Sequence, residues 1–130
     1  ALAEATMGIV PEEVPDYQCM FGVIMGTGVG GGVVRKGKDG QPFVLNGTQG
    51  IGGEWGHNEL EPNGYDCYCG KKGCVEQVLS GPALQRYYAQ ISGKELKMKE
   101  IVARYYADSD PYASQTIDRM LEYFGKQFRC

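Results

Sequence analysis

Residues 53–76, with the sequence GEWGHNELEPNGYDCYCGKKGCVE, carry the chain's only histidine and three of its five cysteines. The four side chains follow the spacing His57-x9-Cys67-x-Cys69-x4-Cys74. Zinc in proteins prefers four thiolate or imidazole ligands in a tetrahedron, and glycine-containing turns commonly bring such ligands together. CGKKGC supplies a turn of this kind, so the spacing favours a zinc site that pins this segment.

Two other interpretations of the cluster stay open, namely a disulfide and a set of unliganded thiols. A disulfide would pair two of the three clustered cysteines and leave one over, in a chain without a secretory signal. A bridge between Cys67 and Cys69 would also strain a very short loop. Cys19 falls in a predicted strand and Cys130 ends the chain, so we expect neither to take part.

A zinc ion held by four protein ligands has no open position for water, which predicts a structural metal and not a catalytic one. The segment is too polar and turn-rich to fold around a core of its own. The binding energy of the metal would therefore become folding energy for residues 53–76.

Composition limits the class of protein. The chain has 130 residues, 42% of them apolar and 22% charged, as in one ordinary globular domain or a large piece of one. The net charge is −3 and the basic residues are scattered, which argues against a nucleic-acid surface. No membrane span or signal peptide is recognisable, so we expect a cytoplasmic protein. The opening ALAEATMG resembles the tail of a helix and suggests a longer parent protein.

The pattern along the chain predicts strands first and helices afterwards. The apolar run at 18–25 predicts a first strand, and a glycine turn follows it. The β-branched residues at 31–45 lie on both sides of Asp39-Gly40, a favoured hairpin turn pair, and predict a second and a third strand. A long irregular loop follows at 46–74. Helices are expected at 74–80, 80–93, 97–108 and 110–128, the second capped by Ser80 and stopped by Gly93. In the last helix the spacing predicts a core stripe, made of Ile117, Met120, Leu121, Phe124 and Phe128.

The segment GTGVGGG, residues 26–32, contains G-x-G-x-x-G at Gly26, Gly28 and Gly31. A dinucleotide-binding fingerprint requires a helix directly afterwards, but VVRKGK predicts a strand, so that interpretation fails. A glycine turn between two strands can still bind phosphate through its backbone, and Thr27 adds a hydroxyl donor. The alternative is a hairpin that needs glycine only for its backbone angles, and both interpretations stay open here.

Two glutamates flank the cluster. Glu54 precedes His57 by three residues and Glu76 follows Cys74 by two, so a bound metal would draw both segments together. A pair of carboxylates is a good acceptor for neighbouring sugar hydroxyls. The alternative is that both are ordinary solvated glutamates.

Taken together, GTGVGGG, GEWGH, CYCGKKGCVE and LSGPAL resemble, in order and spacing, the ROK family of sugar kinases and repressors. The resemblance covers essentially the whole chain, and E-x-G-H with C-x-C-G-x-x-G-C-x-E is a specific combination. It implies an α/β actin-like ATPase fold (ribonuclease H-like), in which residues 1–130 form a partial C-terminal domain with a sheet, a zinc-pinned loop and then helices. The N-terminal domain and the adenosine-binding end would be missing from this chain.

The resemblance also implies roles for individual residues. Glu54, His57 and Glu76 match the family's sugar-binding positions. The phosphate-binding turn matches Gly26, Thr27 and Gly28. The structural Zn²⁺ ligands match His57, Cys67, Cys69 and Cys74. The general-base aspartate would lie upstream of Ala1, so we expect this chain alone to be inactive.

The predicted function is ATP- and Mg²⁺-dependent phosphorylation of a hexose, such as glucose, fructose or a related sugar, by the intact parent. The family also implies a homodimer. A sugar-responsive repressor of the same family is the alternative, and the intact glycine turn favours the kinase. A zinc-stabilised interaction module without a small ligand is the third interpretation.

Overall fold

The computed structural model describes residues 18–128. The predicted helical tail at ALAEATMG and Cys130 lie outside these residues. The described chain forms two compact units. Unit 1 contains residues 18–24 and 29–56, and unit 2 contains residues 25–28 and 57–128.

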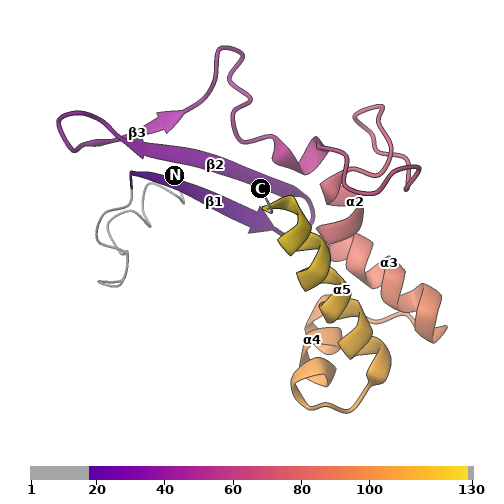
Figure 1. Ribbon diagram of the computed structural model, residues 1–130. Helices are drawn as coiled ribbons and strands as arrows, with labels where there is room; N and C mark the ends of the chain where they lie inside the picture. The colour runs from indigo at the N-terminus through magenta and orange to yellow at the C-terminus, as the bar shows by residue number, and fades with distance from the viewer. Residues whose placement is uncertain (1–17, 129–130) are drawn as a thin grey trace. The chain divides into compact units, whose positions relative to one another are not determined.

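The three predicted strands are confirmed. They are β1 (Cys19–Met25), β2 (Val29–Lys36) and β3 (Pro42–Leu45), which form one sheet in the order β1-β2-β3 (Figure 1). β2 and β3 are antiparallel, with Val33 opposite Leu45 and Lys36 opposite Pro42. The predicted hairpin turn lies between them, where Gly40 has a φ of 77°.

The dinucleotide interpretation is excluded by the position of β2. The strand begins at Val29, so Gly31 lies inside a strand and not before a helix. The other two glycines of the pattern, Gly26 and Gly28, belong to the turn between β1 and β2. Val34 is the most buried residue of β2, whereas every residue of β3 is exposed, as is common for a strand at the edge of a sheet.

Unit 2 holds the helices α2 (Val75–Leu79), α3 (Gly81–Ser92), α4 (Met98–Tyr106) and α5 (Pro111–Gln127). All four predicted helices are confirmed, and their ends follow from local chemistry. The Ala83 N–H donates to Ser80 Oγ at the start of α3 (3.3 Å). Gly93 ends α3 with a φ of 70°, a conformation that favours glycine.

The core of the helical unit lies where α5 packs against α3 and α4 (Figure 1). The predicted stripe on α5 is only partly right. Ile117 is buried and Met120 packs against the core, but Leu121 and Phe128 are 53% and 47% exposed. The buried face is instead formed by Ala113, Thr116, Ile117 and Met120. The period of 3.6 residues was correct, and the face that meets α3 and α4 begins one turn earlier.

Asp110 closes the N-terminus of α5 from a buried position. Its carboxylate accepts hydrogen bonds from Tyr88 Oη (2.6 Å), Arg104 Nη1 (3.0 Å) and the backbone N–H groups of Tyr112 and Ala113 (3.0 and 3.4 Å). The Tyr88 hydroxyl, followed by the guanidinium, lowers the pKa of Asp110 to about 2. This network joins α3, α4 and α5 at one point.

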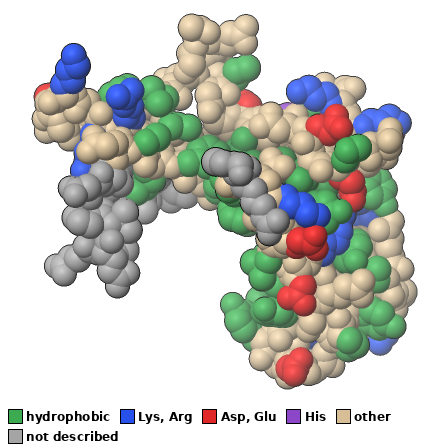
Figure 2. Space-filling view, in the orientation of Figure 1, with side chains coloured by type: hydrophobic (Ala, Val, Ile, Leu, Met, Phe, Trp, Pro, Cys, Tyr) green, Lys and Arg blue, Asp and Glu red, His purple; other side chains and the backbone are tan. Residues whose placement is uncertain are grey.

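No helix among residues 18–128 is long and apolar enough to cross a membrane. On the face drawn in Figure 2, the Lys and Arg side chains are scattered among acidic and apolar ones and do not gather into a patch.

Candidate functional site

The loop between the sheet and the helices is ordered by its own backbone. The N–H groups of Leu60 and Glu61 both donate to the Gly73 carbonyl (2.8 and 3.0 Å), and the Gly73 N–H donates to the Tyr65 carbonyl (2.9 Å). Short segments of the loop are thereby paired without a sheet. The loop buries few large apolar side chains, so hydrogen bonds and the cysteine cluster are what hold its shape.

A second contact anchors the loop to α5. Glu61 Oε1 accepts from Arg119 Nη2 (3.0 Å) and from Tyr123 Oη (3.4 Å). The Arg119 guanidinium also lies 4.5 Å from the ring centroids of both Tyr87 and Tyr123. The side chain of Arg119 is only 18% exposed, so this ion pair is better shielded from water than a surface pair.

The four predicted metal ligands lie together. The ligand atoms of His57, Cys67, Cys69 and Cys74 are all within 4.8 Å of one another. Cys69 Sγ is 3.6 Å from Cys74 Sγ, and Cys67 Sγ is 3.6 Å from His57 Nδ1. Tetrahedral zinc, with bonds of about 2.3 Å to sulfur and about 2.0 Å to nitrogen, requires S–S and S–N separations of about 3.8 and 3.6 Å. The donor set and its spacing therefore fit zinc.

The three thiols have different surroundings. Cys67 and Cys74 are buried and Cys69 is exposed, and all three are free cysteines in the structure. Burial, together with the neighbouring thiols, raises the pKa of Cys74 to about 12. A hydrogen bond from the Lys71 backbone N–H lowers the pKa of Cys69.

The two nitrogens of His57 face different partners. Nδ1 faces Cys67 Sγ, and Nε2 is 3.0 Å from the hydroxyl of Tyr68. The rings of His57 and Tyr68 meet edge to face, with centroids 5.1 Å apart. Nothing in the sequence singles out Tyr68, because a residue between two cysteines gives no signal beyond its position. Lys71 Nζ also donates to the His57 carbonyl (3.3 Å).

The turn between β1 and β2 is tied to the helices of unit 2. The Gly26 N–H closes the turn by donating to the Gly28 carbonyl, and the Gly81 N–H at the start of α3 donates to the Gly26 carbonyl (both 2.8 Å). Gly26 has no left-handed φ, and a Cβ built there would meet nothing within 4 Å in the described chain. Neither backbone angle nor local packing requires glycine at this position. The hairpin-only interpretation therefore leaves Gly26 unexplained.

Glu76 reaches this turn from α2. A Cβ built on Gly28 would lie 2.7 Å from Glu76 Oε2, so the carboxylate occupies the space that a side chain at position 28 would need. The structure thus brings Glu76 to the glycine turn. Glu54 belongs to unit 1, where it is exposed and its N–H donates to the Ile51 carbonyl (3.1 Å).

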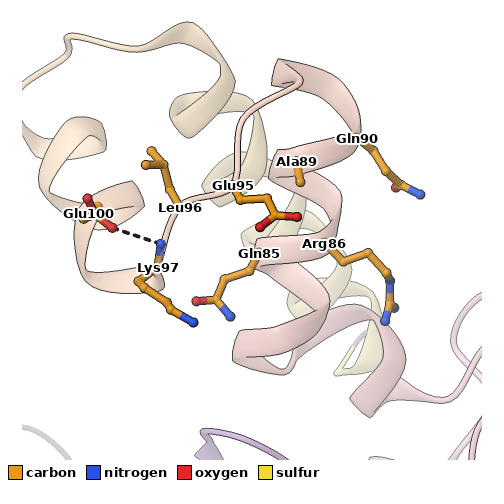
Figure 3. A pocket seen from close by; sticks show the side chains of 8 residues that line it. All are labelled: Gln85, Arg86, Ala89, Gln90, Glu95, Leu96, Lys97 and Glu100. Atoms are coloured by element: carbon orange, nitrogen blue, oxygen red, sulfur yellow. Dashed lines mark hydrogen bonds between the residues drawn. The ribbon is translucent and has the colours of Figure 1, made fainter.

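Unit 2 has several cavities, of which one lies away from the predicted site and another lies beside the turn. One of about 790 Å³ lies between α3 and the start of α4 (Figure 3), and its lining is Gln85, Arg86, Ala89, Gln90, Glu95, Leu96, Lys97 and Glu100. No residue of the predicted site lines it. The other, of about 420 Å³, is lined by Gly26 and Thr27 of the turn and by Met25, Leu79, Gly81, Pro82, Leu84, Gln85, Met98 and Met120. It offers a mainly apolar surface directly beside the turn.

These features can be compared with known proteins. The sequence model of the ROK family matches residues 1–129. The chain belongs to the ROK family. The structure has the α/β, actin-like ATPase fold of this family, with the sheet before the helices along the chain.

Three ROK proteins or relatives show how much of the family fold the chain covers. The N-acetyl-D-glucosamine kinase of Mannheimia succiniciproducens is 36% identical over 107 residues, which are 74% of this chain and 34% of that protein. The crystal structure of the ROK hexokinase from Thermus thermophilus matches with a TM-score of 0.69 at 34% identity, over 83% of this chain and 34% of the hexokinase. The crystal structure of a ROK family transcriptional regulator, a homologue of the E. coli MLC protein, gives a TM-score of 0.71 at 31% identity, over 95% and 32% of the two chains. The chain spans about a third of the length of each.

Proposed function

We propose that the protein containing this chain is a sugar kinase that transfers phosphate from ATP to a hexose, such as glucose, fructose or an N-acetylated relative. The observation that carries the proposal is the contact of Glu76 with the glycine turn at Gly28. A group suited to holding sugar hydroxyls lies against a turn suited to holding phosphates. The kinases among the similar proteins support this assignment.

The proposed roles follow from what each side chain offers. Glu54 and Glu76 accept hydrogen bonds from sugar hydroxyls, and His57 borders the sugar. Gly26 and Gly28 add no side chains of their own to the turn, and the Thr27 hydroxyl donates to a phosphate oxygen. ATP supplies the phosphoryl group, and Mg²⁺ neutralises charge on its oxygens. Phosphoryl transfer requires the sugar hydroxyl and the ATP phosphate to be held in a fixed relative position. In this proposal, the residues of this chain bind both groups and hold them there.

The cysteine cluster serves the same purpose in this proposal. Zn²⁺ held by His57, Cys67, Cys69 and Cys74 would be structural, since four protein ligands close its coordination shell. The cluster keeps the irregular loop in one conformation and thereby fixes the His57 ring. Cys74 directly precedes α2, so the cluster also fixes the start of the helix that carries Glu76.

We assign the chain to part of the C-terminal domain of a cytoplasmic, homodimeric kinase that acts on a small sugar and binds neither nucleic acid nor membrane. The strand, turn, loop and helix order supports the domain assignment. On the face drawn in Figure 2 the basic residues are scattered, which argues against a nucleic-acid surface on that face.

The test is ATP turnover by the intact protein, coupled to ADP detection, across a panel of hexoses and N-acetylhexosamines. We expect turnover with one or two of these sugars. The variant Glu76→Gln should raise the sugar KM about tenfold or more, because it removes the charge from a carboxylate that accepts hydroxyl hydrogen bonds. Glu122→Gln is the matched control, since Glu122 lies on the exposed side of α5 beside Lys126. Absence of turnover with every sugar would refute the kinase.

A sugar-responsive ROK repressor is the second candidate, because a ROK transcriptional regulator matches over 95% of the chain. Saturable sugar binding without turnover would favour it. Gly26 favours the kinase, because a repressor that only binds sugar does not need a turn that binds phosphate.

A further inference from the structure

The three thiols of the cysteine cluster differ in their access to solvent. Cys69 is exposed, whereas Cys67 and Cys74 are only 6% and 0% exposed. A thiol that binds a metal is held as the thiolate, and oxidation of a cysteine follows its thiolate character and its exposure. An oxidant that arrives from solution therefore reacts at Cys69 first.

Cys69 has one suitable partner for a disulfide within the cluster. Its Sγ lies 3.6 Å from Cys74 Sγ, so a bond requires the two sulfur atoms to approach by about 1.5 Å. Cys67 is only two residues from Cys69, and a bridge between these two would strain a very short ring. The Cys67 sulfur also faces His57 Nδ1, at 3.6 Å. The geometry therefore favours Cys74 as the partner.

The turn between Cys69 and Cys74 has room for this approach on one side. A Cβ built on Gly70, directly after Cys69, would meet nothing within 4 Å in the described chain. A Cβ built on Gly73, directly before Cys74, would collide with the Glu61 carbonyl, so this side of the turn is closely packed. The Cys74 thiol is therefore held in place, and the exposed Cys69 thiol can move towards it.

We propose that Cys69 and Cys74 form an oxidation site, at which hydrogen peroxide converts the two metal-binding thiolates into a disulfide and the cluster loses its zinc. The Cys69 thiolate first gives an electron pair to one peroxide oxygen: an S–O bond forms, the O–O bond breaks, and hydroxide leaves. The Cys74 thiolate then attacks the Cys69 sulfur, so that the S–S bond forms, the S–O bond breaks and a second hydroxide leaves. The two thiolates lose two electrons to the peroxide, and two protons from solvent convert the two hydroxides into water.

The oxidation has a consequence for the rest of the cluster. Only His57 and Cys67 remain as ligands, whereas structural zinc sites hold the metal with four. Cys74 directly precedes α2, the helix that carries Glu76, so loss of the metal also releases the start of that helix. The zinc and the disulfide interpretations of the sequence are then two states of one cluster. Only the expected effect on sugar binding rests on the proposed function.

The test is a titration of the intact, zinc-loaded protein with up to about one equivalent of hydrogen peroxide, the amount that forms one disulfide. A chromogenic indicator measures the released zinc, and we expect about one zinc per disulfide. Dithiothreitol with added zinc should restore the metal, because a disulfide is reducible. Cys19→Ser is the matched control and should respond as the wild type does, since Cys19 is also exposed but lies in unit 1.

Peptide mapping identifies the pair. The remaining thiols are alkylated and the protein is digested with trypsin, which cleaves after Lys71 and Lys72, between the two cysteines. Mass spectrometry should then find Cys69 joined to the peptide that contains Cys74, with Cys67 alkylated. In the oxidised protein we also expect the sugar Kd to rise about tenfold, the effect of displacing one charged hydrogen-bond acceptor.

The possible results are separable. Zinc that stays bound after peroxide treatment, a disulfide that includes Cys67, or a loss of zinc that dithiothreitol cannot reverse overturns the inference. A wild-type protein without zinc overturns it as well, because the proposed oxidation acts on metal-binding thiolates. These results leave the kinase standing. Zinc release with the Cys69–Cys74 disulfide, in a protein that neither binds nor phosphorylates any sugar, supports the oxidation site and refutes the proposed function.

Discussion

Replacing Tyr88 by phenylalanine removes one hydroxyl from the centre of unit 2 and leaves the ring in place. The hydroxyl donates to Asp110 Oδ2 at 2.6 Å, and Tyr88 is fully buried beside Ile101 and Ala113. The substitution leaves no large cavity, so the loss is mainly that of a hydrogen bond to a charged acceptor. The other partners of Asp110, above all Arg104, remain.

Hydrogen bonds to charged groups contribute about 1.5–3 kcal/mol to stability. The acceptor keeps its remaining hydrogen bonds and is not left unsatisfied, which favours the lower end of that range. We expect Tyr88→Phe to lower the free energy of unfolding by about 1.5–2 kcal/mol at neutral pH.

The pH dependence distinguishes this bond from general packing. The pKa of Asp110 is lowered from 3.8 to about 2 in the folded chain, first by the Tyr88 hydroxyl. A lowered folded pKa gives stability that is present above about pH 4 and is lost as the pH falls towards 2. The difference between wild type and Tyr88→Phe should therefore be largest at neutral pH and should shrink over this acidic range.

Urea denaturation followed by the helical circular dichroism signal measures both quantities, because all α-helices of the described chain belong to unit 2. Tyr106→Phe is the control and should change the midpoint little, since that ring is 82% exposed. Equal effects of the two substitutions, or a Tyr88→Phe effect that does not shrink in acid, would refute the reasoning.

Two further predictions concern the site. Elemental analysis should find about one zinc per chain, since the four ligands form one tetrahedral site. The variant Cys74→Ser should lose the metal, and the control Cys19→Ser should keep it. Bound zinc in both variants would contradict the assignment. Gly28→Ala should lower sugar turnover by about tenfold or more, because the new Cβ would lie 2.7 Å from Glu76 Oε2 and displace the carboxylate. Gly30→Ala, where a Cβ meets nothing within 4 Å, is the control, and equal activity of the two variants would contradict the proposed role of Glu76.

Sequence predicted the elements of this fold well because their boundaries are set by neighbouring residues. Asp39-Gly40 forms its hairpin turn, Ser80 caps α3 and Gly93 ends it, each through contacts within a few residues. The buried face of α5 was placed less well. Its phase depends on where α3 and α4 meet it, and Leu121 has the same hydropathy whether or not a neighbouring helix covers it.

In the candidate site, too, features set by local sequence were predictable and contacts between distant residues were not. The proximity of the four candidate metal ligands was predictable because few residue types bind zinc and their spacing is restricted. Glu76 lies beside Gly28, which is 48 positions away in the sequence. Tyr68 is hydrogen-bonded to His57, which is 11 positions away. No local pattern specifies the paths of the loops that bring these residues together. Glutamate and tyrosine are also common surface residues, so their types alone carry little information.

The placement of Glu76 links the cysteine cluster to the glycine turn between β1 and β2. Cys74 is fully buried and lies two residues before Glu76, so the backbone leading to that carboxylate is fixed at the cluster. At its other end the carboxylate meets Gly28, in the turn whose Gly26 carbonyl accepts a hydrogen bond from Gly81 at the start of α3. A short helix of five residues cannot hold such a position by its own propensity. The carboxylate of Glu76 therefore owes its position to the cysteine cluster on one side and the glycine turn on the other. Under the proposed function, this dependence would be the reason for a structural metal beside a sugar site.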